Sequence, residues 1–414
     1  MADRAFKAST GSRLLRQWLP CAAVCGIGML IGLLLFPSAG RDDTHITCWS
    51  AYSLAHSGEM VNYNGERVEQ SSSLLQVLLL ALLTLVTGLD TVSLSRAVSV
   101  LFGIGSVIAV FVLVKRSAEP TASLSAAIFT ALSVYFLYWS FGGLETTMVC
   151  FTGICVIISV ADYLGDHTVN SPLIPSFAIL MLLLTRPEAP MLLEGMLACT
   201  LILIRLKAEF SKKAMATRKA FTAKLLVLMG ICAALTCAII VFRLWYFEAV
   251  FPQPVRAKCA SLSLSTIQNG FTYLSISLFG NNQAMSALVF ITIAAVFVII
   301  LTELASKELN LYKLLSVVYC AAYLAFTILS GGDWMEGGRF LVFFLPVAMT
   351  FIPLALICLT AHTLPMVLTT IVIACLQTAT IFEFACYSST SMPLWATPLG
   401  KHNVSHLSWF ERHN

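Results

Sequence analysis

The chain has 414 residues, of which 58% are hydrophobic and only 11% are charged, and its mean hydropathy is +0.86. This composition excludes a water-soluble globule with a polar surface and predicts an integral membrane protein. The apolar runs are unbroken, which favours spanning helices over barrel strands. The net charge of +4 is explained by the cations of the loops, which orient a membrane protein, and it indicates no nucleic-acid partner.

The first apolar run, residues 17–36, follows a basic segment and exceeds the core of a signal peptide, so we expect a retained first span with the N-terminus inside. Ten further runs have near-spanning length: 92–114, 119–140, 144–161, 171–185, 189–206, 225–246, 284–302, 314–330, 339–359 and 364–382. The sequence thus predicts an all-α, polytopic fold of about eleven transmembrane helices, in one domain over residues 1–382. A short outer tail, 383–414, follows it.

One apolar run, residues 73–89, is expected to lie at the outer membrane surface. If it crossed, Lys115 and Arg116 would lie outside; as a juxtamembrane helix of the outer loop 37–91, it leaves them inside with the basic stretch 205–224. The longest polar segments then lie outside, together with the C-terminus. The thirteen cysteines have no metal-type spacing and form no recognisable disulfide framework.

Two adjacent acids, Asp42 and Asp43, follow the first span at the start of an expected helix. One of them can cap this helix, and the helix dipole favours its ionised form. Adjacent residues point in different directions, so at most one should face a site. Taken alone, the pair fits a solvated loop end equally well.

The later outer segments combine turn residues with charges. Arg256 and Lys258 lie outside against the positive-inside bias, which indicates an anion such as a lipid phosphate. Arg339 follows a glycine-rich turn and can grip a phosphate through two parallel donors. Lipid headgroup contact is the alternative for Arg256 and Lys258, and mutual neutralisation is the alternative for the charges of Arg186 and Glu188. Carboxylates and cations on one face suit transfer of a group from a lipid phosphate at the outer leaflet.

The order of these segments resembles the GT-C superfamily of polytopic glycosyltransferases, and in particular the branch of mycobacterial arabinofuranosyltransferase B. Six motifs carry the resemblance, in order over about 300 residues: DD at 42–43, NGERVE at 64–69, GLET at 143–146, TRPE at 185–188, PQPVRAK at 252–258 and GGDWMEGGRFL at 331–341. The resemblance implies inverting transfer of a sugar, such as arabinofuranose, from a polyprenyl-phosphate donor to an acceptor hydroxyl. It makes Asp42 the first choice for the general base and Asp43 the second.

The resemblance also implies roles for the other motif residues. It suggests that the donor phosphate is bound by Arg256, Lys258 and Arg339. Substrate binding is expected from His45, Glu66, Glu69, Glu145, Arg186, Glu188, Asp333 and Trp334. No cofactor follows from the motifs, and convergence of acids on a divalent cation stays open.

The expected setting is a bacterial inner (plasma) membrane, with the active site on the outer, periplasmic face. The acceptor can be a glycan or a surface protein, and many members of the family carry a soluble outer domain where this chain has only its tail. Acceptor recognition is therefore expected to use the outer loops or a partner.

Two other functions are left open by the sequence. A transporter or flippase of a lipid-linked sugar would tend to show internal repeats and midplane ionisable residues. We find no repeat, and the in-span charges Glu194, Arg96 and Arg243 form no set. A non-catalytic assembly subunit is the third possibility, for which loss of the acid pair would be silent.

Overall fold

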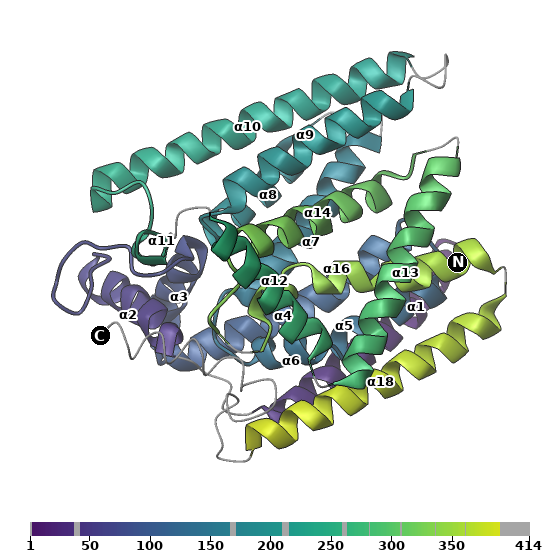
Figure 1. Cartoon of the computed structure of the whole chain (residues 1–414), viewed down its shortest axis with the longest axis horizontal. Coiled ribbons are helices and arrows are strands. Elements are labelled where there is room, and N and C mark those ends of the chain that lie inside the picture. The colour runs from purple at the N-terminus through teal and green to yellow at the C-terminus, as the bar shows by residue number, and fades with distance from the viewer. Residues whose placement is uncertain are drawn as a thin grey trace.

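The computed structural model describes residues 2–36, 42–165, 171–208, 215–258, 263–280, 282–306, 309–335, 337–360 and 362–389. Over these residues the chain is a bundle of helices with no strand (Figure 1). This confirms the predicted all-α, polytopic membrane fold.

Eight helices are long and apolar enough to cross a membrane within the described ranges. They are α1 (Ala2–Leu35), α4 (Thr91–Lys115), α7 (Thr146–Gly165), α9 (Ala189–Ala208), α10 (Met215–Phe247), α13 (Gln283–Ala305), α14 (Leu311–Leu329) and α18 (Thr363–Ser389). Side-chain caps begin several of them: Asp90 accepts from the Ser93 amide at α4, and Asn310 accepts from the Lys313 amide at α14.

The other three expected spans are broken or short. Residues 119–140 form α5 (Pro120–Ala131) and α6 (Val134–Ser140), bent by 65°, and the bent pair would make a ninth span. Residues 171–185 form α8 (Leu173–Thr185), whose 13 residues extend only about 20 Å, less than the hydrocarbon core. Residues 339–359 form three short helices, α15 (Arg339–Val342), α16 (Leu345–Met349) and α17 (Phe351–Leu359). Proline, which has no backbone N–H, lies at the start of α16 and within α17.

Short helices gather at one end of the bundle. Figure 1 shows α2 (Asp42–Ser57), α3 (Leu74–Thr87) and α11 (Gln253–Lys258) together on the left, at the end where α10 terminates. Helix α3 begins at the Ser73 cap and ends at Gly88 in the left-handed conformation. Near its end, Thr84 bonds Thr91 at the start of α4. With 14 residues it is shorter than a span, and its place at the outer membrane surface stays a prediction.

The two ends of the bundle differ in chemistry. At one end, which we call the site end, lie the turns 142–145, 186–188 and 331–338. At the other, the basic end, the Arg116 guanidinium lies 3.1 Å from the Asp162 carboxylate, and the Lys224 ammonium donates to the Tyr163 carbonyl at 2.6 Å. The three turns and the basic residues thus lie at opposite ends of the bundle.

Helix α12 (Leu264–Phe279) packs closely against α14 and supports the turn that follows α14. A Cβ on Gly270 would lie 2.2 Å from the Ile328 carbonyl oxygen and 2.7 Å from its Cα. Tyr273, one turn further along α12, packs under Gly332. The α12–α14 contact therefore fixes the position of the glycine-rich turn that follows α14 at the site end.

We expect Gly270→Ala to destabilise the fold by about 2–3 kcal/mol, because backbone atoms of α14 cannot rotate away from the added methyl group. The measurement is the apparent midpoint of thermal unfolding in detergent, which should fall by several degrees. Gly230→Ala on α10 is the matched control, since a Cβ there has no neighbour within 4 Å. Equal midpoints for the two variants would contradict the close α12–α14 packing.

Candidate active site

The turn 142–145 is clamped by three other parts of the chain. Thr44 of α2 donates to the Gly142 carbonyl at 3.0 Å, and Gln76 of α3 donates to the Gly143 carbonyl at 2.8 Å. Ser99 of α4 donates to the Leu144 carbonyl at 2.9 Å. Gly143 has φ 71°, and a Cβ on it would lie 2.9 Å from Ser95 Oγ and from Thr44 Cγ2, so only glycine fits. The position of the next acid, Glu145, is thereby fixed.

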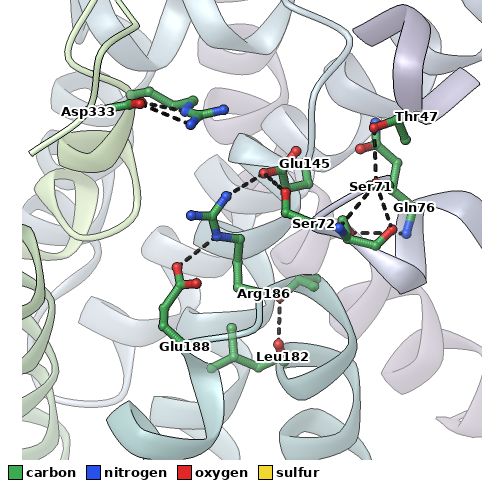
Figure 2. A network of polar contacts seen from close by, with 12 residues as sticks. Thr47, Ser71, Ser72, Gln76, Glu145, Leu182, Arg186, Glu188 and Asp333 are labelled. Atoms are coloured by element: carbon green, nitrogen blue, oxygen red, sulfur yellow. Dashed lines mark hydrogen bonds and ion pairs between the residues drawn. The ribbon is translucent and has the colours of Figure 1, made fainter. Parts of the chain in front are cut away.

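Glu145 and Glu188 share the guanidinium of Arg186. Arg186 Nη1 donates to Glu145 Oε1 at 2.7 Å, and Arg186 Nε donates to Glu188 Oε1 at 2.7 Å (Figure 2). Ser72 Oγ adds a bond to the same Glu145 oxygen at 3.2 Å. The GLET and TRPE motifs therefore meet in one buried ion-pair network. The guanidinium also lies over the Phe343 ring, 5.2 Å from its centroid.

A second ion pair adjoins the first. Arg339 donates from Nε and Nη2 to the two oxygens of Asp333, at 2.6 and 3.1 Å. The Phe340 ring adjoins both guanidinium groups, since its centroid lies 5.6 Å from Arg186 Cζ and 5.6 Å from Arg339 Cζ. Five of the predicted site residues thus form one cluster, the acid–arginine network: Glu145, Arg186, Glu188, Asp333 and Arg339.

The charges of the network support one another. Burial alone would raise the pKa of the Glu145 carboxyl, but the guanidinium groups of Arg186 and Arg339 outweigh it and leave this pKa below its ordinary value. Three carboxylates face two guanidinium groups, so the network carries one net negative charge when all are ionised. It is internally satisfied and does not present a free cation to an anionic ligand.

Glu69 pairs with a residue that the sequence analysis left isolated. Its two oxygens accept from Arg243 Nε and Nη2 at 2.8 and 3.0 Å, although the residues lie 174 positions apart. The Glu69 carbonyl accepts from the Gln253 amide at 2.9 Å. Burial raises the pKa of the Glu69 carboxyl, and Arg243 offsets part of this. The pair ties the NGERVE segment to the end of α10 and the start of α11.

The acid pair lies at the start of α2, beside the turn 142–145. Asp43 is half-buried and precedes Thr44, the residue that bonds Gly142. Asp42 begins the helix, but its side chain lies outside the described part of the chain. His45 is exposed one turn further on. The structure thus brings the predicted base region to the same turn that supports the acid–arginine network.

The other predicted residues are not among the members of the network. Glu66 is exposed and accepts from Asn62 Nδ2 at 2.7 Å, within the turn 62–66. Trp334 is 62% exposed. Arg256 is exposed on α11, while the side chain of Lys258 lies outside the described residues.

Sequence reasoning missed Arg96, which lies in the second turn of α4. A Cβ on Gly143 would be 3.6 Å from Arg96 Cγ and 2.9 Å from Thr44 Cγ2, so Arg96 borders both the turn 142–145 and the start of α2. Its side chain is exposed, and no described residue forms an ion pair with it. The sequence did offer one indication of a role for Arg96. It lies within two turns of the end of the predicted span 92–114, on the same side of the membrane as the acid pair.

The side chains that the structure describes form no ready-made metal site. No three His, Cys, Asp or Glu residues of this part of the chain gather closely enough to hold an ion. Glu145 and Asp333 are instead each engaged by an arginine. The residues of the network therefore do not fit a metal centre.

No protein-family model and no curated protein matches the sequence. Solved structures match in fold. The archaeal oligosaccharyltransferase AglB from Archaeoglobus fulgidus, in complex with an inhibitory peptide and a dolichol-phosphate, is similar with a TM-score of 0.60 and 13% identity, over 91% of this chain and 56% of that one. ArnT from Cupriavidus metallidurans in the apo state has a TM-score of 0.54 and 15% identity, over 85% of this chain and 61% of that one.

This chain spans less than two thirds of the length of either protein. The likeness confirms the GT-C type of fold that the motifs predict. It does not single out the arabinofuranosyltransferase branch.

We expect Glu145→Gln to destabilise the protein by about 2–4 kcal/mol, because it removes one of the two carboxylates that neutralise a buried guanidinium. Thermal unfolding in detergent at neutral pH measures this. Glu59→Gln is the matched control, since its ion pair with Arg67 has side chains 47% and 55% exposed and should matter little. A midpoint for Glu145→Gln equal to that of the control would contradict the account.

The same pair predicts a pH dependence. Because the folded-state pKa of Glu145 lies below the ordinary value of 4.5, its stabilisation is present above that pH and is lost as the pH falls through the folded-state value. The difference in unfolding midpoint between wild type and Glu145→Gln should therefore narrow on acidification. A difference that widens below pH 4.5 would have the wrong sign.

Proposed function

We propose that this protein is a membrane glycosyltransferase that moves a sugar from a polyprenyl-phosphate donor to an acceptor hydroxyl. One observation carries the proposal. At one end of a GT-C-like bundle, the acid–arginine network adjoins the turn 142–145, and beside that turn lie the start of α2 with its acid pair and Arg96, which has no ion pair among the residues that the structure describes.

The chemistry assigns the acids of α2 to the acceptor. Asp42 or Asp43 takes the proton from the acceptor hydroxyl, whose oxygen attacks the anomeric carbon of the donor sugar. The bond between that carbon and the phosphate oxygen breaks, and the polyprenyl phosphate leaves with the electron pair. Attack opposite the leaving group inverts the anomeric configuration. The α2 helix start favours the ionised form that a base requires.

The donor phosphate needs cationic side chains that are not already paired with a carboxylate. Arg339 directs two donors to Asp333, so it can offer only its remaining N–H groups. Arg96 and Arg256 have no ion pair among the described residues and are exposed at the site end. We therefore assign the main phosphate contact to Arg96, with Arg256, Lys258 and Arg339 as further candidates. Positive charge there stabilises the leaving phosphate as the bond breaks.

The proposed donor sugar and acceptor are taken from the resemblance of the sequence motifs. We assign a pentose, arabinofuranose, as the donor sugar and a glycan or surface protein as the acceptor. His45, Glu66 and Trp334 remain proposed substrate contacts, and the site would face the periplasm from a bacterial inner membrane. The buried pairs of Glu69 and Glu188 fit a supporting role better than direct contact.

The test is release of polyprenyl phosphate from a polyprenyl-phosphate arabinofuranose donor by the purified protein in lipid nanodiscs. We expect the double variant Asp42→Ala, Asp43→Ala to lose at least about a hundredfold in turnover, because no base remains at the start of α2. The single variants show which acid is the base.

Glu119→Ala is the control, since this exposed acid lies at the start of α5, at the basic end. It should turn over like wild type. Full turnover by the double variant would refute the assignment, and translocation of intact donor without a covalent product would identify a flippase instead.

A further inference from the structure

Four aromatic side chains form a column at the surface of α2. Tyr63 stacks on Trp49 with centroids 4.4 Å apart, Trp49 stacks on Tyr52 at 5.8 Å, and Tyr52 stacks on His56 at 3.9 Å. The interplanar angles between neighbouring rings lie between 21° and 28°, so each ring is stacked on the next. We call this set the ring column. None of these residues belongs to the acid–arginine network.

The spacing along α2 places the column on the face that starts at the acid pair. His45, Trp49, Tyr52 and His56 recur at intervals of four, three and four residues, which is one face of a helix. Position 42 precedes His45 by three residues and falls on the same face by this spacing. The column thus runs along α2 away from the proposed base.

Tyr63 is held rigidly although it is 63% exposed. Asn62 Oδ1 accepts from the Asn64 and Glu66 amides, both at 2.9 Å, and the Asn62 amide donates to the Glu66 carbonyl at 2.9 Å. These bonds order the backbone of the turn 62–66, and the stack on Trp49 orients the Tyr63 ring, whose other side is open to solvent. An exposed ring held in this way can bind a ligand with little loss of conformational entropy.

The surroundings of the column favour a neutral polar ligand over lipid. Its rim is polar: Asn64 and Glu66 are exposed, and the charges of Glu59 and Arg67 neutralise each other at 2.6 Å. The neighbouring helix α3 has a different surface. Most of its exposed side chains are aliphatic, including Leu82, Leu85 and Val86, which are 57%, 69% and 73% exposed. The ring column is therefore aromatic with a polar rim, whereas the exposed side of α3 is mainly aliphatic.

We propose that the ring column is a binding platform for a neutral oligosaccharide, which stacks a sugar ring on the outer face of Tyr63. A sugar ring presents C–H groups on one face and hydroxyl groups around its edge, and it therefore matches an aromatic face with a polar rim. The inference rests on the proposed glycosyltransferase function and narrows its acceptor to a glycan chain that lies along α2 toward the acid pair.

The test is binding of linear arabinan and mannan oligosaccharides to the full chain in nanodiscs, without donor, by saturation-transfer NMR and titration. Wild type should bind at least one of them. Tyr63→Ala should weaken binding about fivefold to tenfold, because a stacking contact is lost, while Tyr63→Phe should retain it. The matched control is Trp245→Ala, an aromatic of α10 that is 77% exposed and lies outside the column.

This readout is independent of turnover. Binding is measured without donor and needs no proton transfer, so failure of the platform and failure of the transferase can be told apart. Three results would overturn the proposal: no binding of either oligosaccharide by wild type, equal binding by Tyr63→Ala, or binding of a serine- and threonine-rich peptide at Tyr63 in place of the sugars. Equal binding would also be the result if the rings faced lipid.

Discussion

The buried pair of Glu145 and Arg186 is the constraint on which the site end depends. A guanidinium removed from water must be matched by carboxylates at hydrogen-bond distance, or the fold loses several kcal/mol. Here Glu145 and Glu188 both supply that match, at 2.7 Å each, from the start of α7 and the turn after α8. Because Glu145 is placed by a turn that α2, α3 and α4 clamp, one ion pair fixes the relative positions of five helices.

This constraint separates charges that hold the structure from charges that can act. The acid–arginine network and the Glu69–Arg243 pair are buried and satisfied, so their removal should appear first as lost stability. Arg96 and the acids of α2 are not part of these networks. In the proposed reaction the phosphate leaving group needs a cation and the acceptor hydroxyl needs a base, and Arg96 and the start of α2 both border the rigid turn 142–145.

Much of the fold could be predicted from sequence because hydropathy and the positive-inside bias act locally. They predicted the long helices and the gathering of the polar motifs at one end. The break between α5 and α6 has no Pro or Gly at Leu132 and Ser133 to mark it, and was missed. The partner of Glu69 lies 174 residues away and depends on tertiary packing, so Arg243 looked isolated. Arg96 looked isolated for the same reason, because its neighbours Gly143 and Thr44 come from other segments.

The central claim is that the donor phosphate binds at the site end, outside the satisfied acid–arginine network. The most direct measurement is a cryo-EM structure of the protein in nanodiscs with polyprenyl phosphate bound. The account predicts phosphate density within hydrogen-bond distance of the Arg96 guanidinium, with the Glu145–Arg186–Glu188 bonds intact. Phosphate density at the basic end, beside Lys224, or at an Arg186 released from its carboxylates, would contradict it.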